Sequence, residues 1–277
     1  MAGDGAGGGR RSPEPALGPA AGLKPFEYNT ANLIAALSFY GTVERREGLT
    51  LVTSPVEHPA FNVAVLDAPV PDEAALLERA HEAASHFRNL LRGFNFYACE
   101  DLLDPRTARR LDTLLDPLRL VRILDAPGME AEDLLAPARI LPPLEFARVA
   151  TPRERAAFTG LISSAFNIPY ATARVLYEPA ERWRTAFEAW VGYLAGEPVT
   201  CGAAVEEAEA LGIYSVATLH GHRHCGCAEA IVRHAVAEHR TRGCRGPLVL
   251  QSTPDGRRLY RALGFRRTTR FAVYASH

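Results

Sequence analysis

The chain has 277 residues, of which 47% are hydrophobic and 23% charged, with a formal net charge of −1. This composition is typical of a globular protein, and the length fits one large domain or two ordinary ones. No block of like charge indicates a nucleic-acid groove, and no apolar run is long enough to span a bilayer. We therefore expect neither nucleic acid nor a membrane as a partner.

The cysteines bear on the compartment. There are five, an odd number, and three of them lie near the C-terminus. This is not the pattern of a secreted disulfide framework, so we expect reduced thiols. The N-terminus also lacks the apolar core of a secretory signal, since Arg10 and Arg11 are followed by Pro- and Gly-containing sequence. A cytoplasmic protein is expected.

Residues 1–24 are rich in Gly, Ala and Pro, which predicts a disordered tail. From 25 to 141 helical and strand patterns alternate, which favours an α/β layer. The clearest helix has Leu76, Ala80 and Phe87 on one face, with Gly93 after its end. The patterns predict helices over 32–40, 72–92 and 106–115 and strands over 49–53, 61–66, 94–99 and 120–124.

A second unit is expected over 142–277. Pro142-Pro143 marks its start, because a double proline continues neither a helix nor a central strand. Thr151-Pro152-Arg153-Glu154 has the form of a capping box with Pro at the first helical position. The patterns predict a strand over 144–150, helices after Thr151 and Pro169, and strands over 187–195, 199–205 and 211–219.

A loop over 220–227 connects the last of these strands to an amphipathic helix that ends at Gly243. The first N–H groups of a helix have no internal partner, and the helix dipole favours negative charge there. Gly226 lets a phosphate approach the backbone, and Arg223 adds a positive charge. The residues predict a phosphate or pyrophosphate cradle that has neither Walker nor dinucleotide-fingerprint spacing.

The sequence Arg223-His224-Cys225-Gly226-Cys227-Ala228 resembles the Arg/Gln-x-x-Gly-x-Gly/Ala signature of the GNAT superfamily of N-acetyltransferases. Val216-Ala217-Thr218 looks like the splayed fourth strand of that family. Leu259-Tyr260-Arg261-Ala262-Leu263-Gly264-Phe265 is similar to its helix after the fifth strand. The resemblance covers roughly 144–277. His224 departs from the pattern, since many members have Gly at that position.

The first half, 25–141, has a similar alternation of elements without the loop, and resembles the degenerate N-terminal half of tandem family members. The resemblance therefore implies an α/β (α+β) fold of two GNAT-like units. Each unit would have a mixed, mostly antiparallel sheet flanked by helices. Residues 142–277 would form the catalytic unit.

The resemblance also implies a reaction. Acetyl-CoA would be the cosubstrate, and a primary amine of a small molecule or peptide would attack its thioester directly, with no metal. Tyr260 would donate a proton to the CoA thiolate. A homodimer is left open. The residues implied in cofactor binding are Val216, Ala217 and Thr218 for the pantetheine arm and Arg223, His224, Cys225, Gly226, Cys227 and Ala228 for the pyrophosphate.

The general base is not assigned. Glu206, Glu207 and Glu209 lie between the third and fourth predicted strands of this unit, where a solvated charged turn is the alternative interpretation. Tyr214, on the fourth strand, is another candidate.

Two other functions remain open. Imidazole and thiolate are ligands that zinc prefers, so a regulatory metal site is an alternative interpretation of the loop, although its spacing is not that of a usual zinc motif. The other alternative is an acyl-CoA-binding sensor or structural protein without turnover. The loop residues of the zinc hypothesis are His220, His222, His224, Cys225 and Cys227.

Overall fold

The computed structural model describes residues 22–276, so the tail expected over 1–24 lies outside the described residues except for its last three. In this part of the chain the strands form one sheet of eleven, in the order β1-β2-β3-β4-β11-β5-β10-β9-β8-β7-β6. Two neighbouring pairs, β3·β4 and β9·β10, are parallel, and the other pairs of the described sheet are antiparallel. The predicted mixed, mostly antiparallel strand arrangement with flanking helices is confirmed, but the sheets expected for two units are one continuous sheet.

The helices and strands follow the sequence patterns over most of the chain. The first half contains α1 (Pro25–Leu37), β1 (Thr42–Arg46), β2 (Leu49–Thr53), β3 (Val63–Leu66), α2 (Glu73–Asn89), β4 (Asn95–Cys99), α3 (Pro105–Arg109), α4 (Leu111–Leu115) and β5 (Leu120–Ala131). The second half contains β6 (Glu145–Arg148), α5 (Pro152–Phe166), α6 (Tyr170–Tyr177), β7 (Phe187–Leu194), β8 (Glu197–Glu207), β9 (Ala210–Thr218), α7 (Cys227–Thr241), β10 (Leu248–Gln251), α8 (Arg257–Ala262) and β11 (Arg266–Ser276).

Several elements differ from the sequence patterns. Helix α1 begins at Pro25, seven residues before the helix predicted over 32–40, and β11 was not predicted. The predicted helix over 106–115 is two short helices that break at Arg110. Strand β1 was not predicted, because it is a largely polar edge strand. Strand β5 extends seven residues beyond the predicted 120–124, across Pro127 and Gly128, which argue against a central strand.

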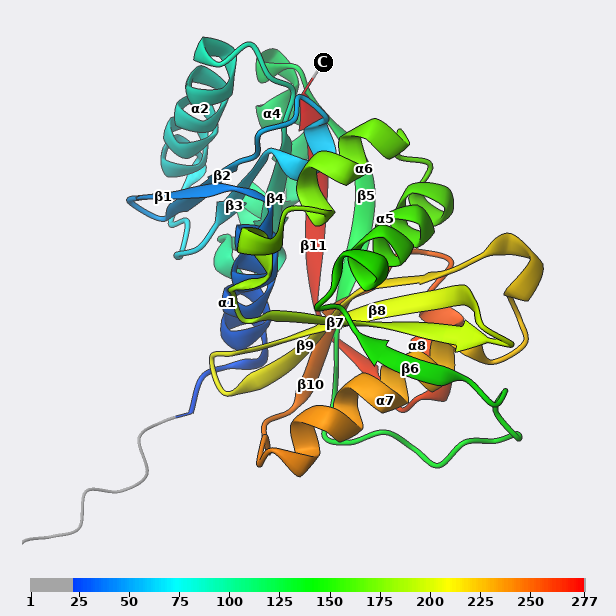
Figure 1. Cartoon of the computed structure of the whole chain (residues 1–277). Helices are drawn as coiled ribbons and strands as arrows, with labels where there is room; N and C mark the ends of the chain where they lie inside the picture. The colour runs from blue at the N-terminus through cyan, green and yellow to red at the C-terminus, as the bar shows by residue number, and fades with distance from the viewer. Residues whose placement is uncertain (1–21, 277) are drawn as a thin grey trace, which may run out of the picture.

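The long strands β5 and β11 join the two halves of the chain. Strand β11 lies between β4 and β5, and its residues from Phe271 to Ala275 pair with β4 of the first half. Strand β5 lies between β11 and β10, and its residues from Gly128 to Ala131 pair with β10 of the second half. Each half therefore provides its last strand to the other, and β5 and β11 run side by side through the centre of the molecule (Figure 1).

Helix α1 also crosses from one half to the other. It belongs to the first half by sequence, but the fully buried Asn32 donates from Nδ2 to the carbonyl oxygens of Val205 and Ala210, each at 3.0 Å. Helices α5 and α6 cover an apolar core that includes Phe158 and Tyr177. A separate core lies beneath α7 and α8. The predicted capping box is present at the start of α5.

Because β11 is shared, damage to it should destabilise both halves together. We expect Phe271→Ala, at a fully buried position, to lower the free energy of unfolding by about 3–5 kcal/mol. Unfolding in urea should remain one transition, with the same midpoint by tryptophan fluorescence and by circular dichroism. Both tryptophans lie in the second half, so fluorescence reports on that half alone. The control is Arg267→Ala at an exposed position of β11; two separate transitions would show that the halves are uncoupled.

Candidate functional site

The parallel strands β9 and β10 separate after their first residues. They pair only at Leu211 with Leu248 and at Gly212 with Val249, and β9 then continues to Thr218 alongside β8. The parallel pair of the first half, β3 and β4, stays closed, because a further bridge joins Val70 to Leu103 beyond the strands. Separated strands leave backbone N–H and C=O groups without ladder partners, so the β9–β10 opening is a place where a ligand can bond to the backbone.

A bulge in β9 marks this opening. The register against β8 shifts between Cys201 and Ala203, and Ser215 has φ of +50°. That left-handed conformation is unusual for a residue other than glycine and is often found at functional sites. Val216, Ala217 and Thr218 follow the bulge directly, at the carboxyl end of β9.

The loop after β9 turns the chain into α7. It starts with a short 3-10 turn, and His224 and Gly226 then take φ values of +64° and +94°. The Arg223 side chain folds back over the loop, with Nε donating to the carbonyl oxygen of Thr218 at 3.3 Å. Cys225 is exposed, whereas Cys227 is buried in the first turn of α7. The nine predicted cofactor-binding residues therefore lie at one corner, where β9 ends and α7 begins.

Tyr260 lies on α8, which follows β10. Only 8% of it is exposed, and its ring packs edge-on against Phe265 at 5.8 Å between centroids. Burial raises the pKa of the Tyr260 hydroxyl, so the phenol keeps its proton at neutral pH. Since parallel strands have their carboxyl ends at the same edge of a sheet, the segment that leads from β10 into α8 starts at the edge where β9 ends.

The first half contributes α1 to this opening, which the sequence analysis did not foresee. Gln251, at the end of β10, donates from Nε2 to Asn29 Oδ1 at 2.5 Å. The Tyr214 hydroxyl donates to Asn32 Oδ1 at 2.9 Å. Asn29 and Asn32 are three positions apart and therefore share one face of α1. This spacing is the sequence signal that could have indicated a polar contact there. Their partners lie about 200 residues away, so the sequence did not reveal the contact.

Residues 185–267, which run from β7 to the start of β11, match the family model described as "Acetyltransferase (GNAT) domain". Over this segment the chain is similar to GNAT acetyltransferases. The similarity supports acyl transfer as the class of reaction and an acyl-CoA as the class of donor. The matched segment includes the β9–α7 loop and Tyr260, which are the parts that the sequence analysis singled out.

Solved structures with the GNAT fold extend over nearly the whole chain. A GCN5-related N-acetyltransferase from Kribbella flavida superposes with a TM-score of 0.69 at 20% identity, over 93% of this chain and 96% of its own. A GCN5-related N-acetyltransferase from Sphaerobacter thermophilus superposes with a TM-score of 0.57 at 16% identity, over 92% of this chain and 94% of its own. At these identities the likeness concerns the fold. No curated protein matches the sequence.

The candidate general bases do not suit that role in this structure. Burial raises the pKa of Tyr214, and its proton is committed to Asn32. Glu206, Glu207 and Glu209 lie at the opposite end of β9. Glu207 pairs with Ala210, which is six positions before Val216 on β9, and this corresponds to about 20 Å along an extended strand. The alternative interpretation of a charged turn therefore fits the three glutamates.

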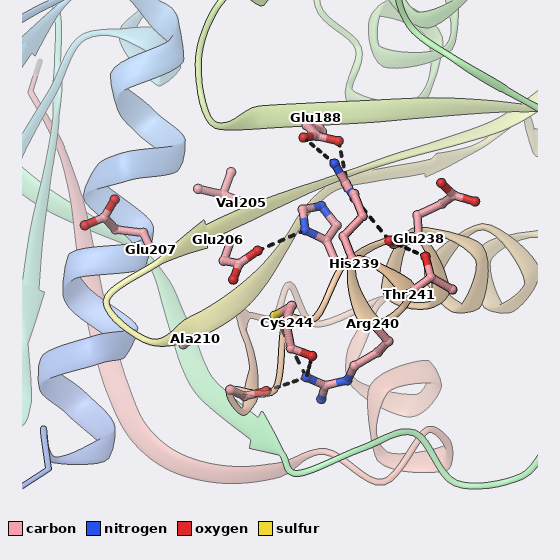
Figure 2. A network of polar contacts seen from close by, with 12 residues as sticks. Glu188, Val205, Glu206, Glu207, Ala210, Glu238, His239, Arg240, Thr241 and Cys244 are labelled. Carbon is pink, nitrogen blue, oxygen red and sulfur yellow. Dashed lines mark hydrogen bonds and ion pairs between the residues drawn. The ribbon is translucent and has the colours of Figure 1, made fainter.

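Figure 2 shows that Glu206 belongs to a polar network at the carboxyl end of α7. Its Oε2 lies 3.4 Å from Nδ1 of the buried His239. In the same network Arg242 makes two hydrogen bonds of 2.9 Å to the Glu188 carboxylate. Burial opposes ionisation of Glu188, but Arg242 and Arg148 together hold its pKa below the usual range. The network fixes α7 to β7 and β8, away from the cradle.

His239 makes this network sensitive to pH. Burial and, less strongly, Arg242 lower the pKa of its imidazole. The ring is therefore neutral in the fold, while the unfolded chain takes up a proton below about pH 6.5. The contribution of the neutral His239 imidazole to the free energy of unfolding is therefore present above about pH 6.5 and is lost as the pH falls.

We expect the free energy of unfolding to drop by about 1 kcal/mol more in the wild type than in His239→Gln between pH 7.5 and 5.5. Urea unfolding of both proteins at the two pH values measures this difference. The quantity compared is the slope of the free energy of unfolding with pH, rather than its absolute value. The other titratable groups are common to both proteins, so the difference between the two slopes reports on His239. Equal slopes would contradict a neutral His239.

The zinc hypothesis finds no support in the geometry. Over residues 22–276 no group of three or more His, Cys, Asp or Glu side chains is arranged to hold a metal ion. The same part of the chain has no helix with the length and apolar character of a membrane span.

Proposed function

We propose that the chain is an N-acyltransferase that moves an acetyl group from acetyl-CoA to a primary amine of a small molecule or peptide. The observation that carries this proposal is the opening between β9 and β10, which leads into the loop of residues 223–228 at the start of α7. Both features occur in the segment that matches the GNAT domain.

The first half, 25–141, is proposed as a degenerate unit, because its corresponding loop between β3 and α2 is already filled. The guanidinium of Arg79 donates to the carbonyl oxygens of Ala68 and Pro69 at 3.0 and 3.1 Å. Asp72 caps α2 by accepting from the Ala75 N–H at 2.8 Å. A carboxylate at the helix start takes the place of a phosphate and repels one. These contacts support one cosubstrate per chain, bound by 142–277.

The chain's own residues have defined tasks in this mechanism. Acetyl-CoA supplies the activated acyl group. Backbone N–H groups near Val216–Thr218 would stabilise the negative charge that develops on the thioester oxygen as the amine nitrogen bonds to the carbonyl carbon. When the carbon–sulfur bond breaks, Tyr260 would give its proton to the thiolate sulfur. A buried, protonated phenol is suited to that donation.

We place the protein in the cytoplasm on the state of its cysteines. All five are unpaired, and Cys99, Cys201, Cys227 and Cys244 are buried. Buried, unpaired thiols suit a reducing compartment.

The first measurement is native mass spectrometry with CoA and acetyl-CoA. We expect one ligand per chain, and the same spectra give the number of subunits. Cys225→Glu should weaken CoA binding at least tenfold, because it adds a negative charge at the exposed centre of the loop. Cys225→Gln is the matched neutral control. Two ligands per chain, or equal binding by the Glu and Gln variants, would contradict the proposed site.

The role of Tyr260 is tested by removing one oxygen atom. Tyr260→Phe should lower kcat about 100-fold with little change in CoA affinity, because the proton donor is lost and the packing is kept. Release of the CoA thiol is followed over a panel of amines.

Tyr193→Phe is the matched control, since Tyr193 is equally buried and lies on β7. Unchanged turnover in Tyr260→Phe would remove Tyr260 from the mechanism. A wild-type protein that binds acetyl-CoA without turning over any amine would favour the sensor function.

A further inference from the structure

The segment that joins the two halves, residues 132–143, runs beside α7 and is called the strap below. Figure 1 shows it as the green loop between β5 and β6. Its first part is firmly held. Arg240 Nη2 donates to the carbonyl oxygen of Glu132 at 2.8 Å, and Arg233 Nη2 to that of Leu135 at 2.6 Å. The Leu135 N–H donates to Leu263 at 3.0 Å.

The second part of the strap reaches the predicted phosphate loop. A Cβ atom on Gly226 would lie 3.2 Å from Pro142 Cδ and 3.4 Å from Leu141 Cδ2. A side chain on Gly226 would therefore crowd the strap by a few tenths of an ångström, and the φ of +94° independently favours glycine there. The strap forms one wall of the loop, although it lies more than 80 residues earlier in the sequence.

Arg139 brings a positive charge to this wall. Its Nη1 donates to the carbonyl oxygen of His224 at 2.9 Å, and its Nε is 3.5 Å from the position of a Gly226 Cβ. The hydrogen bond uses one of the five N–H donors of the guanidinium. Within residues 22–276 no carboxylate forms an ion pair with it. Arg139 is exposed, so these donors are available to a ligand.

We propose that Arg139 is a binding residue for the diphosphate of acyl-CoA, provided by the strap rather than by the β9–α7 loop. The inference rests on the proposed function. Arg223 folds over the loop from the strand side and Arg139 lies over it from the strap side. Two guanidinium groups beside the free N–H groups of a helix start match the two negative charges of a diphosphate.

Isothermal titration with CoA, dephospho-CoA and pantetheine tests the assignment. Dephospho-CoA keeps the diphosphate, and pantetheine has no phosphate. Arg139→Gln should weaken CoA and dephospho-CoA alike by about tenfold and leave pantetheine unchanged, because one charge-assisted contact is lost. Arg139→Lys should recover part of the affinity. Arg88→Gln, on the distant α2, removes the same charge and should bind like the wild type.

The outcomes separate the two proposals. No binding of CoA by the wild-type protein would overturn the proposed function itself. Wild-type binding with an unchanged Arg139→Gln variant would overturn only the role of Arg139. Tighter binding by Arg139→Gln would also overturn it and make the strap a barrier. A loss confined to CoA would assign Arg139 to the 3′-phosphate and refute the diphosphate contact. Thermal melting of each variant confirms that it is folded.

Discussion

The pairing of β5 with β11 is the interaction on which the rest of the structure depends. Strand β11 completes the sheet of the first half, and β5 completes that of the second half. Their shared ladder runs over most of both strands. Because backbone hydrogen bonds continue across it, the two halves have no plane of weak contact between them. The β9–β10 opening is held open by strands that belong to one rigid sheet.

The same continuity explains how the first half can matter to a site in the second. Helix α1 packs on β8 and β9, and its asparagines hold Tyr214 and Gln251 on the two sides of the opening. The fully buried Asn32 is satisfied by three backbone carbonyl oxygens and by Tyr214. Such a network fixes side-chain positions, since leaving any member unpaired in the interior is costly.

Sequence patterns identified what is local. The capping box at Thr151, the amphipathic α7 and the loop around Gly226 are short-range features, and each has its own signal. What the patterns missed depends on distant partners. Strand β5 crosses Pro127 because its neighbours on both sides sustain the ladder, and the position of Arg139 near His224 follows from the path of the strap. Neither has a periodicity that a sequence could reveal.

The position of β11 after all the other described strands in the sequence has a consequence for biosynthesis. A nascent chain that has left the ribosome as far as residue 265 has β4 and β5 but not the strand that lies between them. The facing edges of β4 and β5 would then present unpaired backbone groups, which is the kind of edge that promotes aggregation. The sheet of the first half is therefore completed only after β11 has been synthesised.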